Sequence, residues 1–301
     1  MIESVDEYLE YLRKELAGSD PAILQDALSD TEEHLRNALE QVPGYDGERS
    51  EAETLISIIE KYGSPEEIAA AYQETAILTQ PALAKQPPIV EKSSINRFFS
   101  IIWDAGAWGA LLYLILSMIT GLVYFTWAIT GLSLSLSLLV LIIGLPFTVL
   151  FLLSVRSIAL VEGRIVEALL GVRMPRRLSF TNREAGWWEQ VKGLLLDSRT
   201  WTAVVYMILQ LPLGVIYFSI FVCLTATSLS FMASPILELI FEQPFIHLGA
   251  GAYHIAPWMM PLFVSGGFIL LLASMHLAKF FGRTHGALAK ALLVGASRSS
   301  S

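Results

Sequence analysis

Apolar residues recur at helical spacing throughout the first 78 residues of the chain. Four stripes can be followed: Val5, Tyr8, Leu9, Leu12 and Leu16; Leu24, Ala27, Leu28, Thr31, Leu35 and Leu39; Leu55, Ile56, Ile59 and Tyr62; and Ile68, Ala69 and Tyr72. Residues three or four positions apart share one face of a helix, and an apolar face must be buried against something. The pattern therefore predicts a small four-helix domain over residues 1–78.

Local signals at the helix ends support this prediction. Capping boxes, in which a serine and a glutamate satisfy each other's backbone N–H groups, are expected at Ser4-x-x-Glu7, Ser50-x-x-Glu53 and Ser64-x-x-Glu67. Asp20 before Pro21 is a similar start, while Gly18 and Gly63 mark helix ends. The next segment, residues 79–97, holds three prolines and lacks helical periodicity, so we expect a semi-extended linker.

The remainder, residues 98–301, is dominated by uncharged apolar runs. The longest covers residues 105–155, and two more cover 201–237 and 257–278. Because one transmembrane helix needs about 20 apolar residues, we predict four spans at about 105–129, 134–155, 201–228 and 257–278. The alternating stretch 132–138 is expected to be helical, since an isolated strand cannot satisfy its backbone in lipid. The fold class is therefore all-α, with a small cytoplasmic helical domain and a polytopic four-helix transmembrane domain.

Basic residues predict the orientation of these spans. Lys and Arg are frequent in the loop 156–200 and in the C-terminal tail, whereas the loops 130–134 and 238–256 contain none. By the positive-inside rule, the N-terminus, the central loop and the C-terminus are all predicted to be cytoplasmic. We expect a multi-pass protein of the cell inner (plasma) membrane, with the two loops that lack Lys and Arg outside.

Two amphipathic segments within the central loop predict interfacial helices. One stripe is Ile158, Val161, Ile165, Leu169 and Val172, and the other is Trp187, Trp188, Val191, Leu194 and Leu195. Helices with one apolar face lie in the membrane interface, where tryptophan is favoured. These helices either only frame the spans or pass on a signal from the lipid.

Charge divides the chain into two modules. Residues 1–92 hold 20 acidic and seven basic residues, whereas the rest holds eight acidic and 13 basic residues. The acidic faces of the first module are either solvated surface or a docking face for a basic partner. The candidate docking residues are Glu32, Glu33, Glu66 and Glu67.

The first module resembles the HAAS domain, a small all-helical bacterial module usually fused to membrane segments. The resemblance covers about residues 5–75 and is carried by YLEYLRKEL, LSDTEEHLRNALE and YGSPEEIAAAYQ. Its most specific part is the element from Gly63 to Glu67. HAAS genes often lie near PadR-type regulators, so the resemblance implies a cytoplasmic regulatory protein of that type as a partner.

Residues of about 100–280 resemble the sensor domain that precedes the kinase core in many bacterial histidine kinases. The match is carried by SVRSIALVEGRIVEALLGVRMPRR and LLLDSRTWTAVVYMILQLPLGVIYF. A glycine-rich ATP lid and a P-loop are both missing from this sequence. We therefore expect a protein that is not an enzyme and needs no cofactor, with no catalytic residues and no metal site.

Charges at the cytoplasmic ends of the spans are the candidate relay: Arg156, Glu162, Arg164, Arg173 and Arg199. Arg156 is expected to end the second span. Glu162 lies about 120° from Arg156 around a helix, so we expect it to pair with an arginine of another segment, such as Arg173 or Arg199, or of a second copy. In the outer loop, Glu238, Glu242, His247 and His254 could bind a divalent metal if they converged, but they match no known ligand spacing.

The expected function is that of a non-catalytic sensory or regulatory membrane protein. It would read an envelope or lipid signal and relay it through the acidic domain to a cytoplasmic partner. The alternatives are a small-solute or lipid transport component and a structural membrane assembly factor. Transport is disfavoured because Gln210 and His276 are the only strongly polar side chains well within the uncharged runs. Membrane lipids are expected partners, nucleic acid is not, and a homo-oligomer is compatible with the sequence.

Overall fold

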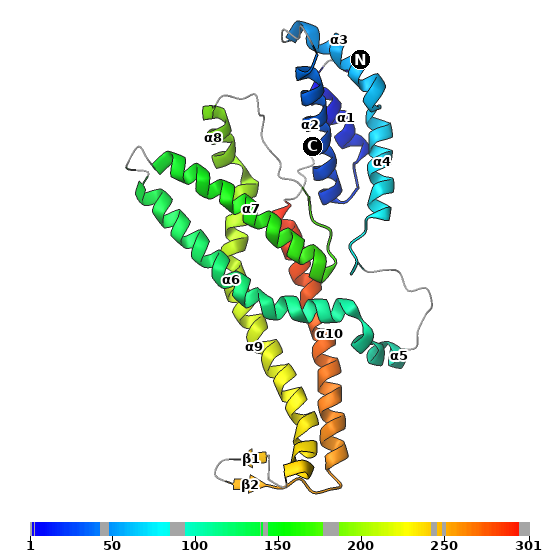
Figure 1. The fold of residues 1–301 in the computed structure, drawn as a ribbon, viewed down its shortest axis with the longest axis vertical. Coiled ribbons are helices and arrows are strands. Elements are labelled where there is room, and N and C mark those ends of the chain that lie inside the picture. Colours follow the sequence, from blue (N-terminus) through cyan, green and yellow to red (C-terminus); the bar gives the residue numbers. More distant parts are fainter. Residues whose placement is uncertain are drawn as a thin grey trace.

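The computed structural model describes residues 2, 4–42, 48–84, 94–138, 140, 144–176, 187–241, 246–248 and 251–294. Apart from one small hairpin, its elements are helices (Figure 1). They are α1 (Val5–Glu15), α2 (Pro21–Glu40), α3 (Glu48–Tyr62), α4 (Pro65–Leu78), α5 (Ser94–Phe99), the 3-10 helix η1 (Ser100–Trp103), α6 (Ala105–Leu138), α7 (Gly144–Leu170), α8 (Trp187–Leu196), α9 (Ser198–Phe241), β1 (Ile246–Leu248), β2 (Gly251–Tyr253) and α10 (Met260–Leu293).

The first four helices form the small domain that the sequence predicts. Their apolar stripes meet in one core, which buries Tyr8, Leu12, Leu35 and Leu55 among others. Ser4 accepts a hydrogen bond from the N–H of Glu7, and Ser64 and Glu67 form a complete capping box. One prediction was wrong: α3 begins at Glu48, so Ser50 lies inside the helix rather than at its start.

Four long helices, α6, α7, α9 and α10, are each long and apolar enough to cross a membrane. This confirms the predicted class, but two predicted boundaries were wrong. Residues 132–138 are helical as expected, yet they continue α6 to Leu138, so the connection to α7 comes after residue 138 and not near 129–135. The predicted interfacial helix at 158–172 is the second half of α7, which runs without a break to Leu170.

α6 and α9 pack closely because small residues lie at their contact. A Cβ atom on Gly121 would come within 2.6 Å of the Gln210 carbonyl oxygen, and one on Gly214 within 2.4 Å of the Ser117 carbonyl oxygen. As α6 advances from Ser117 to Gly121, its contact on α9 moves back from Gly214 to Gln210. The two helices therefore run antiparallel, with their backbones almost touching.

This antiparallel packing separates two connections that the sequence analysis placed on one side. The end of α6 and the start of α7 lie near α8, where Leu132 and Phe147 share an apolar cluster with Leu194 and Leu195. The antiparallel hairpin of β1 and β2 lies at the far end of α9 (Figure 1). The structure thus differs from the sequence-based topology, in which both connections lie outside the membrane.

Candidate functional site

A buried carboxylate, Glu162 of α7, lies where the four long helices cross. Its side chain is 1% exposed. Tyr113 and Tyr206 donate hydrogen bonds to Oε1 at 2.6 and 2.8 Å, and Tyr124 donates to Oε2 at 2.9 Å. Gln210 adds a longer contact to Oε1 at 3.5 Å. A buried polar group needs such partners, because each buried donor or acceptor left without a hydrogen bond costs about 1–3 kcal/mol.

Helix periodicity explains how these side chains converge. Tyr113 and Tyr124 are 11 positions apart on α6, which is about three turns, so they share one face and reach Glu162 from both sides. Tyr206 and Gln210 lie one turn apart on α9. The close α6–α9 contact at Gly121 and Gly214 brings these two faces together. We call Glu162, Tyr113, Tyr124, Tyr206, Gln210 and His285 the carboxylate cluster.

His285 of α10 completes the carboxylate cluster. Its Nε2 atom lies 2.8 Å from the hydroxyl of Tyr113 and 3.1 Å from that of Tyr206. Both hydroxyls also bond to Glu162, so they bridge the carboxylate and the imidazole. The other ring nitrogen of His285, Nδ1, is buried and has no hydrogen-bond partner in the described structure, and the same holds for Oε1 of Gln210.

The position of Glu162 corrects the sequence analysis. Glu162 was expected in an interfacial ring of charges, paired with Arg173 or Arg199, but its described partners are tyrosines and a glutamine. Glu162 also weakens the sequence-based case against transport, because it is an ionisable side chain inside the helix packing. The three tyrosines and His285 were missed altogether. The feature of the sequence that could have identified them is the spacing of polar residues by whole helical turns on otherwise apolar helices.

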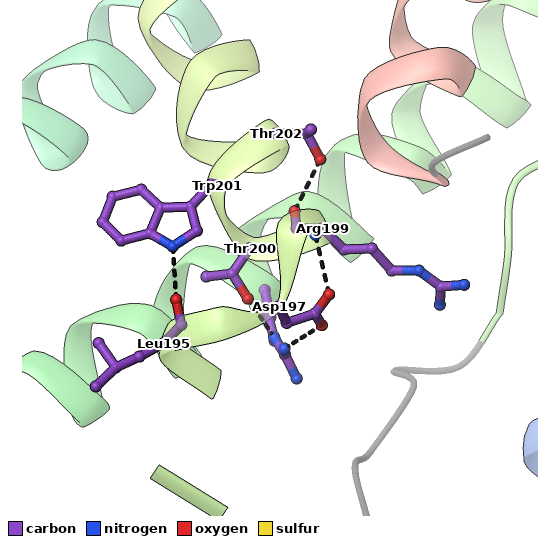
Figure 2. Close-up of polar contacts among 7 residues, drawn as sticks. Leu195, Asp197, Arg199, Thr200, Trp201 and Thr202 are labelled. Atoms are coloured by element: carbon purple, nitrogen blue, oxygen red, sulfur yellow. Dashed lines mark hydrogen bonds and ion pairs between the residues drawn. The ribbon is translucent and has the colours of Figure 1, made fainter. Parts of the chain in front are cut away.

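Arg156 lies within α7, which continues past it to Leu170, and it binds the turn between α8 and α9. Its guanidinium donates to Oδ2 of Asp197 at 2.5 Å and to Oγ1 of Thr200 at 3.0 Å. Figure 2 shows this site, with Oδ1 of Asp197 accepting from the backbone N–H of Arg199 at 3.0 Å. Asp197 thus links the start of α9 to the middle of α7.

The other predicted relay arginines are dispersed. Arg164 is paired with Glu167 on the surface of α7, at 3.0 Å. The side chain of Arg199 points away from Asp197 (Figure 2) and lines a small pocket of about 60 Å³ together with Gln25 and Arg156. The structure therefore brings Arg156 and Arg199 to one site but places Glu162, Arg164 and Arg173 elsewhere.

Arg173 belongs to the junction between the small domain and the long helices. Its guanidinium donates to the carbonyl oxygen of Ala76 at 2.9 Å and to Oγ1 of Thr79 at 3.3 Å. Nearby, the backbone N–H of Arg176 donates to Asp26 at 2.6 Å. On α10, Lys290 donates to Asp20 at 2.5 Å. These contacts dock the small domain on the segment after α7 and on the end of α10.

The same two elements also reach the carboxylate cluster. Met174, in the segment after α7, is buried and lies against Gly163, which is next to Glu162. On α10, His285 of the cluster lies five residues before Lys290 of the junction. Between them, a Cβ atom on Gly286 would come within 2.7 Å of Val172. A displacement of α10 therefore changes both the cluster and the junction.

An ion pair between Asp104 and Lys279 joins the start of α6 to α10. Oδ2 of Asp104 accepts from Lys279, while its Oδ1 accepts from the N–H of Gly106 at 2.9 Å. Burial alone would raise the pKa of Asp104, but the hydrogen bond and the charge of Lys279 outweigh it, so the pKa lies below its usual value.

The predicted docking face remains at the surface of the small domain. Glu33, Glu66 and Glu67 are exposed, and Glu32 is half-buried against Arg36, with which it pairs at 3.2 Å. Glu67 also completes the capping box of α4.

In the predicted outer loop, the structure brings together Glu238 and His254. Oε1 of Glu238 lies 3.0 Å from Nδ1 of His254 and accepts the N–H of Ile255 at 2.9 Å. Glu242 and the side chain of His247 lie outside the described residues. In the described ranges, no group of three or more His, Cys, Asp or Glu side chains could hold a metal ion.

The fold thus defines a helical membrane protein with four long apolar helices. A family model described as "Putative sensor" matches residues 77–293, and the chain belongs to this Sensor family. The match begins at residue 77, near the end of α4, so the region that resembles the HAAS domain lies before it and that resemblance stays a prediction. Neither a curated protein nor a solved structure matches the chain.

Proposed function

We propose that this membrane protein is a non-catalytic sensor whose long helices control the docking of the small domain. The single observation that carries the proposal is that α10 contacts the carboxylate cluster through His285 and the small domain through Lys290. A signal that alters helix packing would weaken the junction. The freed acidic domain would then bind a cytoplasmic regulatory protein, of the PadR type if the HAAS resemblance holds.

The proposal includes an orientation. The small domain and the end of α10 would face the cytoplasm of a bacterial cell, as the basic residues of the central loop and tail favour. The relay would pass through the junction formed by Arg173, Asp26, Asp20 and Lys290. It would not pass through an interfacial pairing of Glu162 with an arginine.

Docking can be measured on the full-length protein in native membranes. A carbodiimide joins a carboxylate to an amine without a spacer, so it should couple Asp20 to Lys290, and mass spectrometry would identify the linked peptides. Asp104 and Lys279 provide an internal control, because their ion pair does not involve the small domain. Coupling of the control pair without coupling of Asp20 to Lys290 would contradict the docked arrangement.

The relay itself is tested by charge reversal on α10. Lys290→Glu places two carboxylates at the junction and should release the small domain. A photo-reactive residue at Glu33 should then form more adducts with a cytoplasmic protein than it does in the unmodified background. Arg283→Glu is the matched control, since it makes the same charge change at an exposed position two turns earlier. Equal adduct formation in all three proteins would overturn the relay.

Transport is a second candidate function, and the buried Glu162 favours it, because ionisable residues inside membrane helices commonly mark ion pathways. The two functions differ in a direct assay. Purified protein in sealed vesicles that contain a pH-sensitive dye should show no protein-dependent proton flux if it is only a sensor. A flux that Glu162→Gln abolishes would favour transport.

A further inference from the structure

Among the residues that the structure describes, the carboxylate of Glu162 is buried without a cationic partner. In the described structure, Arg156 and Arg164, which flank it on α7, are paired with Asp197 and Glu167. The titratable side chains that face Glu162 are Tyr113 and Tyr124 of α6, Tyr206 of α9 and, through the two bridging hydroxyls, His285 of α10. Removing a charge from water is costly, and a buried carboxylate commonly avoids this cost by binding a proton.

The hydrogen atoms of the carboxylate cluster can be counted for the ionised state. Each tyrosine has one hydroxyl hydrogen, and all three point to Glu162. The oxygen of Tyr113 must then accept from Nε2 of His285, so the neutral imidazole carries its hydrogen on Nε2 and leaves a lone pair on Nδ1. This agrees with the structure, in which Nδ1 has no partner.

One added proton can be accommodated by reversing this chain. A proton that arrives at Nδ1 of His285 displaces the Nε2 proton to the oxygen of Tyr113, whose own hydrogen passes to Oε1 of Glu162. The final state holds a neutral glutamic acid that donates to Tyr113, and Tyr113 donates to Nε2 of His285. One proton has been bound, every other group is neutral as before, and the two hydrogen bonds at 2.6 and 2.8 Å remain in place.

We infer that the carboxylate cluster is a proton-binding site, with Glu162 as the acceptor, Tyr113 as the bridge and Nδ1 of His285 as the atom that carries the added hydrogen. Tyr206 lies within reach of the same two groups and provides a parallel bridge. Binding the proton removes the buried negative charge and reverses the hydrogen bond to His285. Because α10 carries His285, proton binding is the stimulus of the sensor proposed above. Only this consequence rests on the proposed function.

Infrared difference spectroscopy tests the proton site without reference to docking. Full-length protein in lipid nanodiscs is titrated across the pH range in which it stays folded. The unmodified protein should gain the carbonyl stretch of a protonated carboxylic acid as the pH falls. Glu162→Gln should lose this band. Glu238→Gln, which alters a second buried glutamate at the far end of α9, should retain it.

A second variant keeps the test decisive if Glu162→Gln does not fold. Tyr124→Phe removes a donor to Oε2 but leaves the chain to His285 intact. It should keep the band and shift its frequency, because the carboxyl group loses one hydrogen-bond donor. The inference is overturned if the unmodified protein shows no titrating band over this range, or if the band survives Glu162→Gln or is unmoved by Tyr124→Phe. Intact proton binding with unchanged docking would instead refute the proposed function alone.

Discussion

The amino group of Lys290 donates to Oδ2 of Asp20, 270 positions earlier in the chain, while Oδ1 of the same aspartate caps α2 through the N–H of Ala22. Asp104 and Asp197 repeat this arrangement. In each, Oδ1 accepts the N–H two residues later and Oδ2 binds a cation from another helix, Lys279 or Arg156. These aspartates fix helix starts to the helices that pass them.

Asp197 therefore has two roles, the cap of α9 and the ion pair with Arg156, that substitutions can separate. Asp197→Asn should keep a cap for α9 but lose the ion pair with Arg156, which is mostly buried. We expect a loss of about 1–3 kcal/mol in unfolding free energy, because the guanidinium loses its charged partner. Thermal unfolding in detergent would measure it. Asp197→Ala removes both roles and should cost more. Equal losses in the two variants would show that the cap contributes nothing, and an Asp197→Asn variant as stable as the unmodified protein would show that the ion pair contributes nothing.

Asp104 gives a pH dependence with a defined sign. Its pKa is lowered in the folded state, so its contribution to stability is present above the unfolded pKa of about 4 and is lost as the pH falls through the folded value. The unmodified protein should therefore lose more stability than Asp104→Asn on acidification below about pH 4. Parallel pH profiles of the melting temperature would contradict the role of the Lys279 ion pair.

Gly214 tests the close contact of α6 and α9. Gly214→Ala would bring a methyl group within 2.4 Å of the Ser117 carbonyl, which is backbone and cannot move aside locally. We expect a loss of about 1–3 kcal/mol, the usual cost of overpacking. The matched control is Gly266→Ala on α10, where an added Cβ meets no atom within 4 Å and should be tolerated. A stability of Gly214→Ala equal to that of the control would refute this packing.

The arrangement of connections predicts a labelling pattern. In a background in which Cys223 is replaced by serine, Val140→Cys lies near the α8 end of the long helices and Pro257→Cys near the β1–β2 end. An impermeant maleimide should label them from opposite sides of sealed membranes. Labelling of both from the same side would restore the sequence-based topology.

Local and periodic features could be predicted from the sequence, whereas contacts between helices could not. Capping residues and apolar stripes located α1–α4, and uncharged runs located the four long helices but not all of their ends. Glu162 was misplaced because its neighbours Arg156 and Arg164 were interpreted as an interfacial charge cluster. Glu162 lies on a different face of the helix from these arginines, so its side chain can point toward the other helices. Its tyrosine partners come from two other helices, α6 and α9, and no spacing within one helix specifies which faces meet.

The small domain also has contacts that no local pattern specified. Asp26 bonds to the backbone of Arg176, 150 positions away, and Arg173 bonds to a carbonyl at the end of α4. Backbone groups are the same at every position, so the sequence carries no mark of which one will be used. The tether predicted for residues 79–97 gave no indication of where the small domain would lie.

The most direct test of the account is the distance between the small domain and α10 in response to the carboxylate cluster. Spin labels at the exposed positions Glu33 and Thr284, in the background without Cys223, would report this distance in nanodiscs. The unmodified protein at neutral pH should show one narrow distribution. Glu162→Gln, which mimics the protonated carboxyl group, should broaden it toward longer distances, whereas Glu238→Gln should not. A distribution that stays unchanged in Glu162→Gln would contradict the coupling between the buried carboxylate and the docked domain.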